Sequence, residues 1–176
     1  SALPDQVIVP DLVVPCDGGD VIEGVCRPSY ARVQYEKRTA GSGASTDTVK
    51  LAADTQAGNL LVLAVGVLWD GTVKPLTVPA GWTLVEQRDN ATGAGSHETV
   101  AVYVYENAPT LVAATGVTVE NGDANARMYL MLVEYAGFRP AGVVDQKISQ
   151  AGSGNPISPG TTAMTTSDRE VWLSFA

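Results

Sequence analysis

The stretch Leu60–Trp69, with the sequence LLVLAVGVLW, is the longest apolar run in this chain and decides its fold class. It has about half of the roughly 20 residues that a membrane-spanning helix needs, and its valines favour an extended backbone. A second apolar run lies at Met128–Val133. Because short runs that are apolar on both faces are typical of buried strands, we expect both to be central strands of a sheet, together with the alternating segment Val100–Tyr105.

Further strand signals lie on either side of these two runs, and no window longer than a few residues has the 3.6-residue apolar period of a helix. Residues 31–36 alternate apolar and polar side chains, which predicts a strand with Ala31, Val33 and Tyr35 on its dry face. The other predicted strands are Thr46–Leu51, Leu76–Val78, Trp82–Gln87, Val100–Tyr105, Gly116–Glu120, Val143–Ser149 and Glu170–Phe175. The pattern predicts an all-β domain over residues 31–176, built as an antiparallel two-sheet β-sandwich. Because the last apolar strand stops at Ala176, we expect this sandwich to be incomplete there or to be completed by a partner strand.

Residues 1–30 differ from the rest and predict an extended N-terminal arm. Four prolines interrupt two short β-branched pieces, and proline removes the backbone donor that a central strand requires. Such pieces suit a sheet edge or the surface of a neighbouring subunit, although a flexible leader is the alternative interpretation. The residues predicted to anchor the arm are Val7, Ile8, Val9, Leu12, Val13 and Val14.

Charge and cysteine usage restrict the classes of partner. Nineteen acidic residues against eleven basic residues give a net charge of −8, with no cluster of Lys and Arg that would hold a phosphate backbone, so we expect no nucleic-acid binding. We also expect no membrane insertion. Cys16 and Cys26 are the only cysteines and His97 is the only histidine, so we expect no metal or cofactor. The glycine-containing spacing between the cysteines allows a disulfide, and two free thiols remain the alternative.

Four segments of the predicted domain, in the same order, resemble a jelly-roll-type β-sandwich family known from phage tail-fibre and other virion proteins and from bacterial surface proteins. They are Ala57–Val65, Pro79–Val85, Val102–Tyr105 and Leu132–Phe138. The resemblance covers roughly Thr46 to Ala176 and implies a jelly-roll-like sandwich with a role in virion or surface structure, in some cases with glycan binding. It implies no catalytic residues.

The candidates for chemistry are few. A hydrolytic triad would have to use His97, which we place in a long hairpin loop at Asn90–Glu98, where a solvated histidine is the more common case. Sequence alone does not pair the carboxylates that a glycosidase needs, which would come from Asp70, Glu86, Asp89, Glu106, Asp123 and Glu134. A sugar-binding site would use aromatic rings, and the candidates are Trp69, Trp82, Tyr103 and Tyr105.

These observations favour a non-catalytic virion structural protein that mediates assembly and surface attachment, as a phage fibre, tail-associated or head-decoration subunit. Its partners would be other virion subunits, a second copy of the chain in a homo-oligomer, and a cell-surface glycan. The expected location is the virion surface. The alternatives are a carbohydrate-binding module or a subunit of a bacterial surface filament, either of which would be extracellular or on the bacterial cell surface.

Overall fold

The computed structural model describes residues 19–22, 25–28, 30–40, 44–93 and 95–149, together with the single positions 161, 163, 164 and 173. Every regular element in this part of the chain is a β-strand, and all the strand pairs are antiparallel. The prediction of an all-β, antiparallel, sandwich-like fold is therefore confirmed. The described residues include no helix that is long and apolar enough to cross a membrane.

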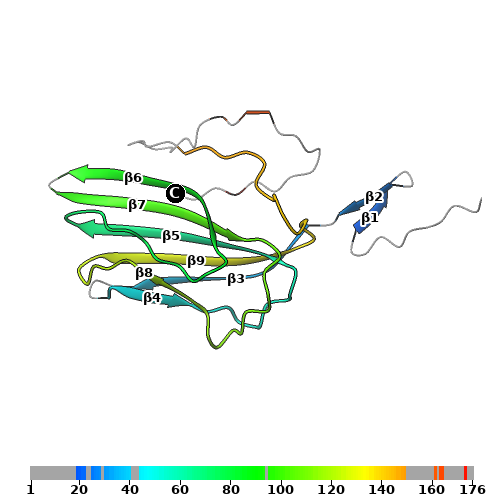
Figure 1. The fold of residues 1–176 in the computed structure, drawn as a ribbon, viewed down its shortest axis with the longest axis horizontal. Coiled ribbons are helices and arrows are strands. Elements are labelled where there is room, and N and C mark those ends of the chain that lie inside the picture. The colour runs from blue at the N-terminus through cyan, green and yellow to red at the C-terminus, as the bar shows by residue number, and fades with distance from the viewer. Residues whose placement is uncertain are drawn as a thin grey trace, which may run out of the picture.

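One layer of the fold is a five-stranded sheet with the strand order β3-β9-β5-β7-β6 (Figure 1). The two central runs recognised in the sequence lie next to each other in it, as β5 and β9. Both are shielded by a strand on each side, which suits side chains that are apolar on both faces. In sheet order the strands are β3 (Ala31–Ala40), β9 (Arg127–Ala136), β5 (Leu60–Asp70), β7 (Ser96–Tyr105) and β6 (Thr83–Gly93).

The second layer is formed by a two-stranded sheet and by loops. Strands β4 (Thr46–Val49) and β8 (Val117–Glu120) pair with each other along their full length. The predicted strand Leu76–Val78 forms only an isolated bridge from Thr77 to Glu120. Pro75 and Pro79 flank this segment, and each lacks the backbone N–H that would extend the ladder.

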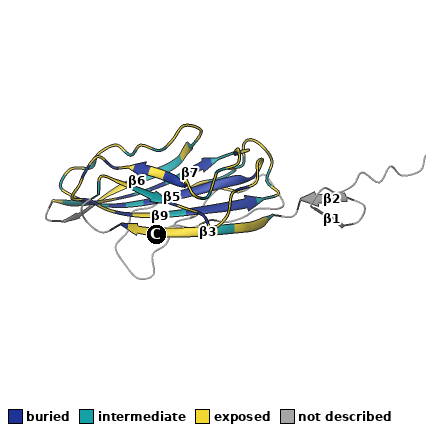
Figure 2. Ribbon diagram, turned by 90° about the horizontal axis from the view of Figure 1, so that it is seen from below, coloured by how far each residue is buried: buried dark blue, intermediate teal, exposed yellow. Residues whose placement is uncertain are grey.

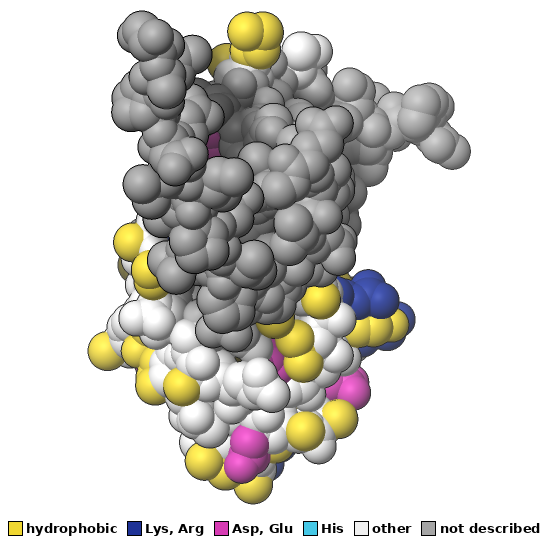
Figure 3. Space-filling view, turned by 90° about the vertical axis from the view of Figure 1, so that its right-hand side faces the viewer, with side chains coloured by type: hydrophobic (Ala, Val, Ile, Leu, Met, Phe, Trp, Pro, Cys, Tyr) yellow, Lys and Arg dark blue, Asp and Glu magenta, His cyan; other side chains and the backbone are white. Residues whose placement is uncertain are grey.

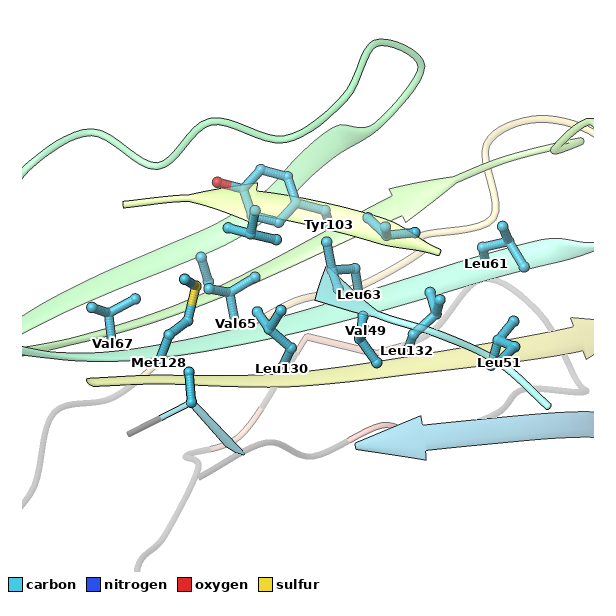
Figure 4. Close-up of a cluster of buried hydrophobic side chains, with 14 of the residues drawn as sticks. Val49, Leu51, Leu61, Leu63, Val65, Val67, Tyr103, Met128, Leu130 and Leu132 are labelled. Carbon is cyan, nitrogen blue, oxygen red and sulfur yellow. The ribbon is translucent and has the colours of Figure 1, made fainter. Parts of the chain in front are cut away.

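The main core lies between the two layers (Figure 4). Alternate residues of β5 and β9 point into it, and the fully buried leucines Leu63 and Leu132 lie directly opposite each other. Complete burial of a leucine contributes roughly 2 to 3 kcal/mol relative to an exposed one. The second layer supplies the facing side chains, among them Val49, Leu51, Val117 and Val119. We call this face of the five-stranded sheet the inner face and the opposite one the outer face.

The outer face carries a smaller apolar cluster of its own. Val62 of β5 and Val133 of β9 are buried there, and Phe138 packs against them from the segment that follows β9. The Phe138 ring stacks on Tyr30 at a centroid distance of 4.4 Å and meets Tyr135 edge-on at 5.9 Å. The chain that leaves β9 is thus fixed to the outer face at one end of the sheet.

The segment Val143–Ser149, which comes after β9 in the chain, lies along strand β6. The prediction that it forms a strand is wrong. The Lys147 ammonium donates to the backbone carbonyl of Val85, and the Ser149 hydroxyl donates to Glu86 at 2.9 Å. Glu106 accepts the backbone N–H groups of Gly142 and Val143. Side chains therefore hold this segment against the edge of the sheet, in place of a backbone ladder.

Strand β3 forms the other edge of the sheet, and most of it is exposed (Figure 2). The prediction of a dry face bearing Val33 and Tyr35 is wrong, because both side chains are about half exposed. A bulge between Arg32 and Gln34 shifts the pairing with β9. As a result Tyr35 lies opposite Val133 of the outer face, and Glu36 lies opposite Leu132 of the inner face.

Two further differences concern the hairpins. Strands β6 and β7 continue until Gly93 pairs with Ser96, so His97 lies within β7 and the expectation of a long loop at 90–98 is wrong. Inside the predicted arm, β1 (Gly19–Ile22) and β2 (Val25–Pro28) form an antiparallel hairpin that the sequence analysis did not expect. Residues 1–18 and most of the predicted strand Glu170–Phe175 lie outside the described residues.

Candidate functional site

Exposed aromatic side chains and cations lie together where β3 and β9 meet on the outer face. Tyr35, Lys37 and Tyr129 are exposed there, and Met131 is half buried. Lys37 lies opposite Met131, and Tyr129 lies opposite Thr39. We refer to these five residues as the β3/β9 strip. Exposed residues of an edge strand such as β3 are often charged, and the half-exposed tyrosines on β3 and on its neighbour β9 are the unusual feature of the strip.

Each tyrosine of the strip is supported on one side. The Arg32 guanidinium lies 4.8 Å from the centroid of the Tyr35 ring, at the distance of a cation–π contact. Tyr129 lies opposite Gly66 of β5. The two residues are in close contact, because a Cβ atom added to Gly66 would lie 3.6 Å from the Cβ atom of Tyr129. Both side chains are nonetheless 46–49% exposed. Each tyrosine thus has a neighbouring group on one side and keeps about half of its surface exposed.

A hollow of about 490 Å³ adjoins the strip at Lys37. Its walls come from β3 and from β4 with the residue after it: Lys37, Arg38, Thr46, Asp47, Thr48, Val49 and Lys50. Arg38 pairs with Asp47 at 3.3 Å, and the Thr48 hydroxyl contacts that of Thr118 at 2.8 Å. Within the described part of the chain, the second carboxylate oxygen of Asp47, Oδ2, is buried without a hydrogen-bond partner. The hollow thus combines an excess of positive charge with hydroxyl groups and one carboxylate.

The rest of the described surface has weaker candidates for a binding site. On the described surface that Figure 3 shows, hydrophobic side chains are dispersed among polar and charged ones, as is normal for a globular protein. A smaller hollow of about 250 Å³ lies beside β6 and includes Leu84, Val104, Val144 and Lys147 in its wall. It exists because the segment after β9 lies against this edge, and it has no exposed aromatic ring.

The aromatic residues proposed from the sequence do not lie together as an exposed platform. Trp69 is 1% exposed and Tyr103 is buried, so both belong to the main core. The indole N–H of Trp69 donates to the Thr99 hydroxyl at 2.8 Å, and this hydroxyl donates to Asp89 at 2.6 Å. Burial raises the pKa of the Tyr103 phenol.

Trp82 and Tyr105 are half buried and pack against each other edge-to-face at 5.7 Å. Both lie against the main core from its margin. The sequence analysis placed Tyr129 on a central strand, and of the tyrosines on β7 and β9 it is the exposed one. The sequence analysis did not single out Lys37 or Lys50. Four of the eleven Lys and Arg residues lie within residues 32–50, and this concentration of positive charge could have indicated the hollow.

Glu134 is the most deeply buried acidic residue of the described chain and holds a loop on the inner face. Its side chain is completely buried. One carboxylate oxygen accepts the Gln56 backbone N–H at 2.8 Å and the Asn59 amide at 2.7 Å. The other accepts the Gln34 amide at 2.7 Å, and Gln34 also exchanges two hydrogen bonds with the backbone of Ala53. Glu134 therefore connects the loop before β5 to strand β3.

Other acidic residues also hold loops. Asp123 accepts the backbone N–H of Asn125 at 2.9 Å and lies 3.4 Å from the Lys74 ammonium. The hydrogen bond from Asn125 and then the charge of Lys74 lower the pKa of Asp123. Hydrogen bonds from Lys147 and Ser149 lower the pKa of Glu86. These carboxylates are thus stabilised in their charged forms and serve as acceptors for neighbouring segments.

The remaining groups proposed from the sequence are the histidine, the cysteines and the residues of the arm. His97 is half buried in β7 and lies opposite Trp69 in the sheet. Among residues 30–40, 44–93 and 95–149, no group of three His, Cys, Asp or Glu side chains is placed to hold a metal ion. Cys16 and the arm residues Val7–Val9 and Leu12–Val14 lie outside the described residues, as does the side chain of Cys26, so the disulfide and the anchors remain predictions.

Comparison of the chain with protein-family models, with curated proteins and with solved structures finds no match. Its function is therefore inferred from its own residues and their geometry.

Proposed function

We propose that the chain is a non-catalytic structural module of a virion, as a fibre, tail-associated or head-decoration subunit, and that it attaches to a surface through the β3/β9 strip. The observation that carries this proposal is the pair of half-exposed tyrosines, Tyr35 on the edge strand β3 and Tyr129 on the neighbouring strand β9, beside the cations of β3. Solvent-exposed aromatic rings with fixed neighbours are typical of recognition surfaces, since they bury a large area at low conformational cost.

The roles of the acidic side chains support a non-catalytic module. Glu134, Glu106 and Glu86 accept hydrogen bonds that hold a loop or the segment after β9 on the sheet, and Asp123 accepts a hydrogen bond within its own loop. A general acid or base would have to leave such a partner in order to exchange protons with a substrate. These carboxylates are therefore better suited to fixing the sandwich than to performing acid–base chemistry.

The edges of the sheet favour attachment through side chains. Strand β6 is flanked by the segment up to Ser149, and β3 carries a bulge and the charges of Arg32, Glu36, Lys37 and Arg38. Bulges and charges at an edge oppose the addition of a further strand. Assembly is accordingly assigned to the N-terminal arm, with Val7–Val9 and Leu12–Val14 docked on a neighbouring copy or on another virion or filament subunit. The corresponding location is the virion surface, or a bacterial surface for a filament subunit.

A carbohydrate-binding module is the second candidate. It is favoured by the same two tyrosines, because exposed aromatic rings are suited to stacking against the apolar faces of sugar rings. A module of this kind would act as a monomer and would not require the arm.

Sedimentation velocity of the full chain tests the assembly. We expect oligomers at micromolar concentration, and we expect Ile8→Asp to shift the population to monomers because a charge cannot be buried in an apolar docking groove without a partner. Gln6→Asp is the matched control, since it places the same charge at a polar position of the arm and should leave the oligomers intact. A full chain that stays monomeric at all concentrations would refute the assembly proposal and leave the monomeric module.

A further inference from the structure

We propose that the β3/β9 strip and the adjoining hollow bind acidic oligosaccharides, with sugar rings on Tyr35 and Tyr129 and sugar carboxylates at Lys37 and Lys50. This inference rests on the proposed attachment function and names the class of ligand for the same surface.

The spacing of the two tyrosines favours an oligosaccharide over a single sugar. Tyr35 pairs with Val133, and Tyr129 pairs with Thr39, so the two rings are separated by four residue positions along the strands. At the rise of an extended strand, this separation is about 14 Å. Both residues point to the outer face, so one extended ligand can contact both rings.

The positive charge of the site lies between and beside the rings. Lys37 lies midway along β3 between Tyr35 and Thr39, on the same face, and it also lines the hollow with Arg38 and Lys50. Arg38 is paired with Asp47, whereas Lys37 and Lys50 have no ion pair with another described residue. Three cations against one carboxylate leave a local charge of about +2 at neutral pH in a chain whose net charge is −8. An anionic ligand is therefore attracted to this region in particular.

The polar groups of the hollow distinguish a sugar from a simple anion. Thr46 and Thr48 supply hydroxyls to the wall of the hollow, beside the largely buried carboxylate of Asp47. A sulfate dianion offers acceptors alone, so it could take hydrogen bonds from the lysines but could donate none to the other acceptors of the hollow. An acidic sugar offers carboxylate acceptors to the lysines and hydroxyl groups to Thr46 and Thr48, which matches the mixture present.

The test is calorimetric titration of the full chain with carboxylated oligosaccharides: oligogalacturonate, oligomannuronate, hyaluronan fragments and oligosialic acid. Each is compared with its methyl-esterified form, which keeps the rings and removes the charge. We expect at least one acid to bind at least about tenfold more tightly than its ester and to weaken with added salt. Tyr129→Ala and Lys37→Gln should each weaken that binding at least about tenfold.

Arg88→Gln is the matched control, because it removes an exposed cation from β6, away from the strip, and should leave the affinity unchanged. Thermal unfolding of each variant verifies its fold. The inference is overturned if no acid binds, if the esters bind equally well, if Tyr129→Ala and Lys37→Gln have no effect, or if polyglutamate binds as tightly as the best saccharide. If the full chain forms oligomers but binds no acidic saccharide, this inference is refuted and the assembly proposal stands. If the full chain is a monomer that binds acidic saccharides through the strip, the assembly proposal is refuted and this inference stands.

Discussion

Replacing Glu134 with alanine is expected to destabilise the fold by about 3 to 5 kcal/mol. The substitution removes the acceptor of three hydrogen bonds, from Gln34, Gln56 and Asn59, in a completely buried position. It also leaves a cavity beneath the loop that precedes β5. Urea unfolding at neutral pH measures the loss as a shift of the midpoint at constant slope.

Two variants delimit this effect. Glu134→Gln keeps one oxygen for Gln56 and Asn59 but turns its amide toward the Gln34 amide, so we expect a smaller loss of about 1 to 2 kcal/mol. Glu120→Ala removes an exposed carboxylate from β8 and should change the stability by less than about 0.5 kcal/mol. If Glu134→Ala were as stable as Glu120→Ala, the loop would be held by something other than this carboxylate.

Gly116→Ala is expected to cost about 2 to 4 kcal/mol. Gly116 precedes β8 with a φ of +69°, in the left-handed region that side chains disfavour. A Cβ atom there would come within 2.5 Å of the backbone oxygen of Val49, on the paired strand β4. Because that oxygen belongs to the backbone, relief requires the two strands of the second layer to move apart.

Gly122→Ala separates the cost of a positive φ from the cost of a steric clash with the added Cβ atom. Its φ of +67° is almost the same, but its nearest neighbour would be the Lys74 side chain at an ordinary 3.8 Å. This variant should cost about 1 kcal/mol, the conformational penalty alone. Equal losses for the two alanine variants in urea unfolding would contradict the close packing of Gly116 against β4.

The central strands were predictable from the sequence because their surroundings leave little choice. The runs Leu60–Trp69 and Met128–Val133 are apolar on both faces, and strands of this kind are typical of the interior of a sheet with cover on each side. Strand β8 has a weaker signal but was also predicted, since Val117 and Val119 alternate with polar residues and point into one core. Local pattern and tertiary environment agree at these positions.

The edges were predicted less well because their environment is set by distant parts of the chain. A single bulge near Val33 reverses which side chains of β3 share a face with the core. The segment Val143–Ser149 has the composition of a strand, yet Lys147 and Ser149 fix it to β6 through side chains. Neither the bulge nor these contacts leave a signature in a short stretch of sequence.

The candidate site was missed for the same reason. Trp69 and Tyr103 were proposed as sugar-binding residues on their type, but they fill the core, and Tyr129 is exposed because it points away from that core. Exposure depends on the face of the sheet from which each ring projects, and this follows from strand register. The concentration of cations between Arg32 and Lys50 was visible in the sequence, but its meeting with Tyr35 and Tyr129 required the pairing of β3 with β9.

Hydroxyl-radical footprinting of the oligomer is the most direct test of the claim that the β3/β9 strip is an outward attachment surface. Tyr35, Tyr129 and Met131 are side chains that radicals oxidise readily when solvent reaches them. We predict the same oxidation rates for these residues in the oligomer of the full chain and in monomeric Ile8→Asp. Protection of all three in the oligomer would show that the strip is a contact between subunits, and would contradict the claim.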